Sequence, residues 1–275
     1  MLKYKVFSKP YDNINLMTNS EILTIGVNQK AFPQFLFKYR SDNAFTENII
    51  TNNELWFNNP LEFNDPYDCN TPININTPLS DIKKWLSSVG VYQQNIDSLA
   101  LQVQQNPNIM KEATENAMKK SGICCFSTLE DSILQWSHYS DYHKGICLKF
   151  DILEDADFFS IPIIVSYRQV MQHFNHFVHA NKVVDYLIQP KFHDWSYESE
   201  IRVVKSEAHI KANKNMRGFK FKDSALKEVI FGKNTPDTVI VKYRQLCANN
   251  NKGHINFFKM KLGSGIHYQL VKQPI

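Results

Sequence analysis

Segments with strand character and segments with helical character alternate irregularly along this chain, and their order limits the folds open to it. The strand-like segments are residues 34–40, 54–57, 122–128, 146–151, 161–167 and 195–204, with others near 220, 230 and 258. Helical spacing of apolar residues covers 42–52, 132–143, 170–191 and 236–248. Because no regular βα repeat connects them, we expect an α+β fold.

The domain organisation follows from length and composition. The 275 residues are 43% hydrophobic, and 19 Phe with 12 Tyr suit a strand-rich or α+β interior. Residues 78–120 carry apolar residues at helical spacing, with a break near Pro107. We expect a single domain over 1–275, with an irregular lead-in over 1–30 and a helical insertion over about 78–120.

Targeting and metal signals are missing from the sequence. It has no apolar stretch of signal-peptide or membrane-spanning length, which predicts a cytoplasmic protein with no membrane partner. The five cysteines are odd in number and form no CxxC pair, so we expect reduced core residues and no metal. A Cys125–His138 nucleophile pair is possible on paper, but the apolar strand around Cys125 predicts a buried, inert thiol.

Polar residues of three separate strands are the strongest candidates for a site. Arg40 ends "KYR", Ser127 and Thr128 end "CFST", and Glu198 and Glu200 lie in "WSYESEIRVV". Read as one strand over 195–204, the last segment places both glutamates and Arg202 on one face. The alternative is an exposed strand face whose ion pairs contribute about 0–1 kcal/mol.

In this order the residues resemble the arginine, serine-threonine and Glu-x-Glu motifs of the ADP-ribosyltransferase superfamily. From about 36 to 232 the chain also looks like a bacterial family of uncharacterised domains, through "KYR", "NDPYD", "CFST", "WSHY", "HKGICLKF" and "WSYESEIR". The resemblance implies a mixed, mostly antiparallel split sheet and NAD as substrate. It also implies a toxin or antiphage effector, with an antitoxin or chaperone as a further partner.

The resemblance also implies roles for the motif residues. Glu200 would stabilise the oxocarbenium-like species formed when nicotinamide leaves the ribose. Glu198 would orient or deprotonate the acceptor. Arg40 would bind pyrophosphate or ribose oxygens, and Ser127 and Thr128 would hold the glutamate or the ribose.

Two further segments extend the prediction. The short helix of "QWSHYSDYHKG" carries His138 and Tyr139, of which Tyr139 is the better candidate to stack on nicotinamide. The stretch "KANKNMRGFKFK", 211–222, is basic and aromatic, which indicates nucleic-acid contacts. The contacting residues would be Lys211, Lys214, Arg217 and Lys220. The alternative for this stretch is a solvated β-hairpin whose lysines protect an edge strand.

The acidic motif "FNDPYD" has two interpretations. Asn64 and Asp65 before Pro66 favour an Asx-type turn, while Asp65 and Asp68 would otherwise bind a cation or support Arg40.

The sequence therefore predicts an NAD-dependent ADP-ribosyltransferase, with RNA slightly favoured over protein as acceptor. Two other functions stay open, a non-catalytic nucleic-acid-binding or regulatory module and an NAD glycohydrolase.

Overall fold

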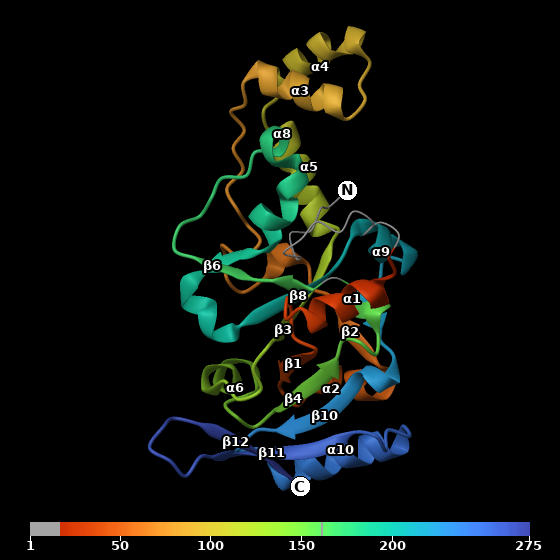
Figure 1. Cartoon of the computed structure of the whole chain (residues 1–275), viewed down its shortest axis with the longest axis vertical. Coiled ribbons are helices and arrows are strands. Elements are labelled where there is room, and N and C mark those ends of the chain that lie inside the picture. The colour runs from red at the N-terminus through yellow and green to blue at the C-terminus, as the bar shows by residue number, and fades with distance from the viewer. Residues whose placement is uncertain (1–16, 161) are drawn as a thin grey trace.

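An eight-stranded sheet forms the centre of the computed structural model, which describes residues 17–160 and 162–275 (Figure 1). In spatial order its strands are β12 (Leu270–Pro274), β11 (Asn256–Leu262), β10 (Leu226–Phe231), β4 (Ile146–Asp151), β1 (Phe35–Arg40), β3 (Gly122–Ser127), β8 (Glu200–Lys205) and β5 (Ile163–Ile164). The β10–β11 pair is parallel and the other neighbouring pairs are antiparallel. The sheet is mixed and mostly antiparallel, and the predicted α+β class is confirmed.

Two small sheets and a set of mainly short helices complete the fold. The small sheets pair β2 (Glu54–Trp56) with β9 (Gly218–Lys220), and β6 (Ser166–Arg168) with β7 (Pro190–Phe192). The α-helices are α1 (Asn19–Asn28), α2 (Ala44–Asn52), α3 (Leu79–Ser88), α4 (Gln93–Gln105), α5 (Ile109–Lys119), α6 (Ile133–Tyr139), α7 (Ala156–Phe159), α8 (His176–His179), α9 (Glu207–Ala212) and α10 (Asp237–Asn249). Short 3-10 or π turns are η2 (Pro60–Glu62), η3 (Ala180–Lys182), η4 (Val184–Ile188), η5 (His193–Glu198) and η6 (Asp223–Ala225).

The two faces of the sheet pack against different cores, as the alternation along β4 shows. Leu148 and Phe150 belong to the larger core, to which α1, α2, α7 and α10 also contribute. Cys147 points to the other face, where Trp136 of α6 joins it in a smaller core. Side chains of a strand alternate between faces, so both faces of β4 are covered, with Lys149 partly exposed. Helix α6 thereby lies over the face that carries the candidate site.

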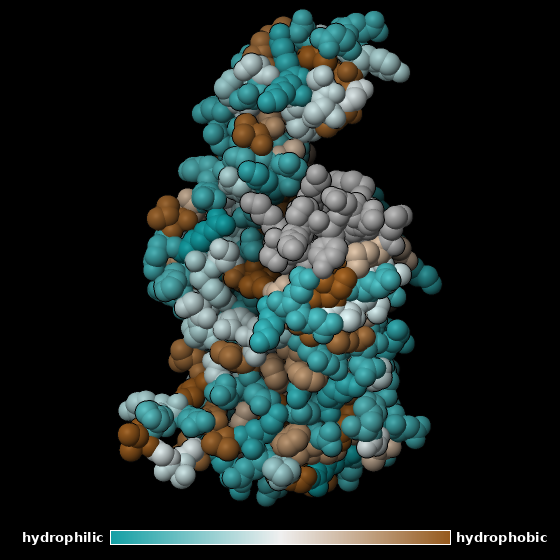
Figure 2. Space-filling view, in the orientation of Figure 1, coloured by the Kyte–Doolittle hydropathy of each residue, from teal (hydrophilic) through white to brown (hydrophobic). Residues whose placement is uncertain are grey.

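Helices α3 and α4 form a hairpin that projects from the main body (Figure 1). The pair has its own small core, built from Ile82 and Leu86 on α3 and Ile96 and Ala100 on α4. In the space-filling view, mainly hydrophilic and neutral residues cover this projection (Figure 2). The expected helices over 78–120 are present as α3, α4 and α5, and the break near Pro107 falls between the last two.

A gap separates β1 from β3 inside the sheet. The two strands share one register pair, Phe37 with Ser127, whereas every residue of β1 from Phe35 to Arg40 is paired with β4. Lys38 bridges part of the gap, because its Nζ donates a hydrogen bond of 2.7 Å to the carbonyl oxygen of Cys125. A side chain here replaces part of the missing backbone ladder.

The irregular lead-in expected over 1–30 is wrong for its second half, which contains α1. Thr18 and Glu21 form a capping box in which each side chain accepts from the backbone N–H of the other. This T-x-x-E signature was present in the sequence. Residues 1–16 lie outside the described residues.

Three expected elements differ from the structure. The strand over 195–204 begins only at Glu200, because η5 precedes it and Ser199 turns the chain in the left-handed region, φ 43°. The strand over 161–167 is divided into β5 and β6, with residue 161 outside the described residues. The helix over 170–191 is reduced to the short turns α8, η3 and η4. Long-range contacts decide each of these regions, and local pattern does not encode them.

Two further expectations concern the state of the cysteines and the presence of membrane-spanning helices. All five cysteines are free thiols, and four of them are buried; Cys125 is half-buried and lines the cleft described below. Burial raises the pKa of Cys125 well above its ordinary value, which disfavours the reactive thiolate. Across residues 17–160 and 162–275, no helix combines the length and hydrophobicity that a bilayer span requires.

Candidate functional site

A cleft of about 210 Å³ opens where β1 and β3 diverge. Four consecutive residues of β1, from Phe37 to Arg40, line it. The cleft therefore follows the edge of β1 that faces β3. Its other lining residues include Ser127, Gln135, Tyr139, Lys191, Glu198 and Glu200. Seven residues were predicted for catalysis or the NAD site. The structure brings five of them together in this cleft: Arg40, Ser127, Tyr139, Glu198 and Glu200.

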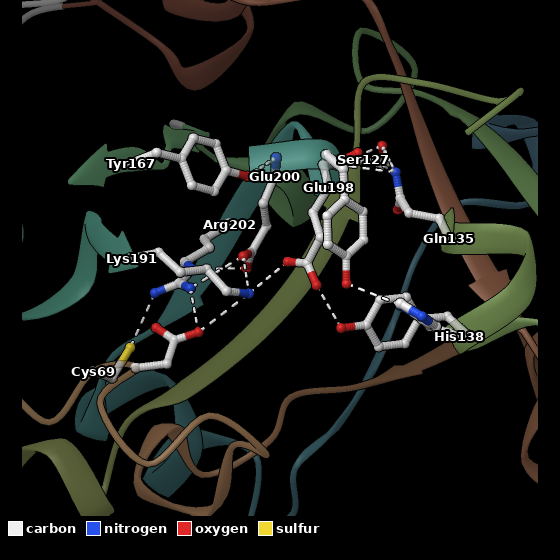
Figure 3. A network of polar contacts seen from close by, with 12 residues as sticks. Cys69, Ser127, Gln135, His138, Tyr167, Lys191, Glu198, Glu200 and Arg202 are labelled. Atoms are coloured by element: carbon white, nitrogen blue, oxygen red, sulfur yellow. Dashed lines mark hydrogen bonds and ion pairs between the residues drawn. The ribbon is translucent and has the colours of Figure 1, made fainter. Parts of the chain in front are cut away.

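The two glutamates reach the cleft by different local structures. Glu200 starts β8 and pairs in register with Ser127 of β3. Glu198 ends η5, and the left-handed Ser199 between them redirects the chain. Both side chains are buried and converge on Lys191 of β7 (Figure 3). The two glutamates therefore lie close together, as predicted, but the turn at Ser199 brings them together and strand alternation does not.

Lys191 and Arg202 hold the acidic groups in one buried ion network (Figure 3). The Nζ of Lys191 lies 2.5 Å from Oε2 of Glu198 and 2.8 Å from Oε2 of Glu200. The guanidinium of Arg202 donates to Oε1 of Glu200 at 2.8 Å and to Oδ2 of Asp68 at 2.7 Å. Burial makes such pairs dependent on one another, because removal of one charge leaves its partner uncompensated.

The network gives the two glutamates opposite protonation tendencies. Burial alone would raise the pKa of Glu200, but the charges of Arg202 and Lys191 outweigh it and hold the pKa well below its ordinary value. Burial raises the pKa of Glu198, and its partners Lys191 and Tyr139 oppose this rise only in part. The pKa of Lys191 is raised in turn, because three carboxylates outweigh the effect of its burial. Glu200 is thus a fixed carboxylate, and Glu198 is the group closer to exchanging a proton.

Ser127 organises the backbone of the site. Its hydroxyl donates a hydrogen bond of 2.8 Å to the carbonyl oxygen of Glu198 and accepts one of 2.8 Å from Nε2 of Gln135. Gln135 Nε2 also donates to the same carbonyl at 3.1 Å. This cluster ties β3 and α6 to the end of η5. Ser127 therefore fixes the main chain of Glu198 rather than either carboxylate.

Arg40 lies in the cleft as a largely buried cation. Its Nε is buried and has no hydrogen-bond partner among the described residues. Burial lowers the pKa of Arg40, since the charged form is poorly solvated there. Asp68, which the sequence suggested as support for Arg40, contacts Arg202 and Lys191 instead. Asp65 forms the predicted Asx turn, in which its Oδ1 accepts from the N–H of Tyr67.

The aromatic residues of α6 divide between the cleft and the surface. The hydroxyl of Tyr139 donates to Oε1 of Glu198. His138 lies outside the cleft, where its Nδ1 is 2.9 Å from the hydroxyl of Tyr197. Thr128 also lies outside it and lines a neighbouring, largely apolar cavity of about 570 Å³ beside α1 and β5, which Glu200 lines as well. Thr128 and His138 therefore do not line the cleft that contains Arg40, Ser127 and Tyr139.

The basic segment 211–222 lies away from the cleft. Glu200 starts β8, whereas this segment begins in the last turn of α9, beyond the opposite end of the strand. Arg217 is held by the fold, since its guanidinium donates to the carbonyl oxygens of Phe57, Ser121 and Lys119. Lys211 pairs with Glu207 on α9. Lys220 lies in β9, opposite Glu54, and Lys214 lies in the turn that follows α9.

Sequence reasoning missed Lys191, Gln135 and the role of Asp68. Lys191 was read as the end of a helix, whereas it is the middle residue of β7. The "NDPYD" motif marked Asp68, but its partners lie more than a hundred residues away and leave no local signal. Within the described part of the chain, no group of three or more His, Cys, Asp or Glu side chains is arranged to hold a metal ion.

A known family model matches a part of the chain that contributes several residues to this site. Residues 135–203, 69 of the 275, match a family model described as "Protein of unknown function (DUF2971)". The matched range includes Tyr139, Lys191, Glu198 and Glu200, whereas Arg40 and Ser127 precede it. No curated protein and no solved structure matches the chain. A resemblance to a family of uncharacterised domains is confirmed in this range, and the ADP-ribosyltransferase resemblance stays a prediction.

Proposed function

We propose that this protein is an NAD-dependent ADP-ribosyltransferase. One observation carries the proposal: side chains picked from three distant motifs, Arg40, Ser127, Glu198 and Glu200, line one cleft together with Tyr139. The gap between β1 and β3 supports the finer fold proposal, a split sheet of the ADP-ribosyltransferase kind with NAD entering at the split.

Glu200 has the properties required of the catalytic carboxylate. It is buried and ionised, and loss of nicotinamide leaves positive charge on the ribose. A fixed carboxylate beside that charge stabilises the transition state without solvent reorganisation. Arg202 and Lys191 keep Glu200 in the charged form at neutral pH. The reacting ribose carbon would therefore lie next to Glu200 in the cleft.

Arg40 and Tyr139 are suited to contact the other groups at the nicotinamide end of NAD. Arg40 lines the cleft, and its guanidinium would bind a pyrophosphate or ribose oxygen there, which would compensate its charge. The ring of Tyr139 lines the cleft and offers a face to the cationic nicotinamide. At about 210 Å³ the cleft is smaller than whole-ligand pockets, which measure about 300–1,000 Å³. It would hold the nicotinamide riboside end, with the adenosine end outside it.

We further propose a nucleic-acid acceptor, with RNA favoured, and an effector role as a toxin or antiphage protein in the cytoplasm. The basic segment 211–222 supports an anionic partner through Lys211, Lys214 and Lys220. Arg217 is committed to backbone carbonyls, which reduces the support it gives to phosphate binding. A protein acceptor and an antitoxin or chaperone partner remain part of the same proposal.

The test is incubation of the purified protein with labelled NAD and, separately, with RNA, DNA and cell protein. The Glu200→Gln variant should lose nicotinamide release. Glu228→Gln is the matched control, because Glu228 is also a buried glutamate between two lysines, Lys149 and Lys272, but lies outside the cleft. It should keep wild-type turnover.

The outcomes separate the three candidate functions. Label in one acceptor pool, lost in Glu200→Gln, supports transfer and identifies the acceptor class. Free ADP-ribose as the sole labelled product would make the protein an NAD glycohydrolase, with water as nucleophile. No nicotinamide release under any condition, with wild-type cellular activity in Glu200→Gln, would reject both enzymes and leave the nucleic-acid-binding module.

A further inference from the structure

Lys191 is a buried ammonium group surrounded by three carboxylates. Its Nζ lies 2.5 Å from Glu198, 2.8 Å from Glu200 and 3.4 Å from Oδ2 of Asp68. The ring of Trp195 lies on the same ammonium, with its centroid 5.3 Å from Nζ. Lys191 also lines the cleft, so it faces any ligand there. A lysine at this depth is unusual unless it is paired, and this one is paired repeatedly.

The three carboxylates do not depend on Lys191 equally. Arg202 gives Glu200 and Asp68 a second cation through direct hydrogen bonds. Glu198 has no such second cation among the described residues, since its other side-chain contact is the neutral hydroxyl of Tyr139. Lys191 is therefore shared by all three carboxylates, but among the described residues it is the one cation within ion-pair distance of Glu198.

We propose that Lys191 is a positioning residue that keeps the Glu198 carboxylate ionised and aimed into the cleft as the proton acceptor for the incoming nucleophile. This rests on the proposed function. The bond from ribose C1′ to the nicotinamide nitrogen breaks, and nicotinamide leaves as a neutral molecule. The acceptor's oxygen or nitrogen forms the new bond to C1′, and its proton passes to Glu198. Lys191 keeps its own protons throughout.

The electrostatics around Glu198 set the direction of the effect. Ionisable groups from several elements surround Glu198. They are Tyr139 on α6, Tyr197 on η5, Lys191 on β7, Glu200 and Arg202 on β8, Tyr167 on β6, Cys125 on β3, and Asp68 in the loop between η2 and α3. Burial raises the pKa of Glu198, and Lys191 is the strongest opposing influence. Without the charge of Lys191 the pKa rises further, so a base that must be ionised works only at higher pH.

The test compares Lys191→Met, which keeps length and loses charge, with Lys191→Arg. Lys149→Met on β4 is the matched control, since Lys149 also pairs with a buried glutamate, Glu228, outside the cleft. Two readouts are taken: transfer rate against pH, and carboxyl ¹³C NMR titration with Glu198 assigned by Glu198→Gln. We expect Lys191→Met to move the Glu198 midpoint and the acidic limb of the transfer rate upward by about one pH unit or more. Lys191→Arg should restore both, and Lys149→Met should change neither.

A third readout covers the case in which Lys191→Met does not fold. In the wild-type protein, the ¹⁵Nζ signal of Lys191 should shift with the same midpoint as the Glu198 carboxyl, and Glu198→Gln should abolish that shift. Two results would overturn the inference: titration of Lys191 and Glu198 with different midpoints, or an unchanged titration midpoint of Glu198 in the folded Lys191→Met variant. Either result is compatible with NAD turnover by the wild-type enzyme, so it leaves the proposed function in place. Absence of nicotinamide release by the wild type rejects the proposed function, and the proton-acceptor role with it.

Discussion

The hydroxyl of Ser127 donates to the carbonyl oxygen of Glu198, 71 positions further along the chain, at 2.8 Å. This bond joins the end of β3 to the turn that separates the two glutamates. A serine often taken as a reactive or ligand-binding group serves here to fix a main-chain position. The geometry of the acidic cluster depends on it, because Glu198 and Glu200 lie on either side of that turn.

Ser127→Ala should therefore reduce stability and activity together. The change leaves the Glu198 carbonyl and Nε2 of Gln135 with one partner fewer each, which costs about 1–3 kcal/mol for buried groups. Displacement of Glu198 should lower the transfer rate by about tenfold or more. Urea unfolding and nicotinamide release measure the two effects. The control is Ser88→Ala, on the exposed end of α3, which should change neither the stability nor the transfer rate. Equal losses of stability and rate in the two variants would contradict a specific role for Ser127.

The two glutamates should respond differently to amide substitution. At neutral pH, Glu200→Gln removes a carboxylate from a buried pair and should lower the free energy of unfolding by about 3–5 kcal/mol. Glu198→Gln should cost about 1 kcal/mol or less, because Lys191 keeps its ion pairs with Glu200 and Asp68 and an amide oxygen still accepts from Lys191. Urea unfolding at several pH values measures both.

The pH dependence of each contribution follows from the direction of its pKa shift. The pKa of Glu200 is lowered in the folded state, so its stabilisation is present above the ordinary carboxyl value of about 4.3 and is lost as pH falls through the folded value. The pKa of Glu198 is raised, so its contribution is complete below about 4.3 and is lost as pH rises through the folded value. Identical pH profiles for the two variants would contradict the network described above.

Arg40→Met should separate stability from ligand binding. Burial disfavours the charge of Arg40, so its removal should leave the free energy of unfolding unchanged or higher. Loss of the guanidinium should weaken NAD binding by about tenfold, or about 1.4 kcal/mol, and reduce the NAD-dependent rise in melting temperature. Arg244→Met on α10, whose guanidinium lies over Phe257, is the control and should keep that rise. A full NAD response in Arg40→Met would exclude Arg40 from the site.

The sequence predicted individual strands well and their relationships less well. The "FLFKYR", "GICCFS" and "ICLKFD" segments are the strands β1, β3 and β4, since their apolar residues fill both cores. The alternation in "WSYESEIRVV" suggested one continuous strand, and a left-handed Ser199 gives no local warning. Pairing between strands, and hence the gap beside β1, is a long-range property that a single sequence does not contain.

The same distinction applies to the site. Residue types with a chemical signature, Arg40, Ser127, Glu198 and Glu200, were found from motifs. Lys191 was missed because lysine is common and its partners come from three other segments. Thr128 and His138 were included because of their sequence neighbours, yet each lies beside a cleft residue and outside the cleft itself. Adjacency in a strand or a short helix does not mean a shared direction.

The single register pair between β1 and β3 affects which sequence changes the cleft can accept in related chains. Where two strands part, main-chain amides and carbonyls face the opening, and one of them, the carbonyl of Cys125, is reached by Lys38. Main-chain groups are the same whatever residue carries them. A ligand held partly by these groups would tolerate drift of the surrounding side chains. A one-residue slip at the Phe37–Ser127 pair, in contrast, would displace every contact at once.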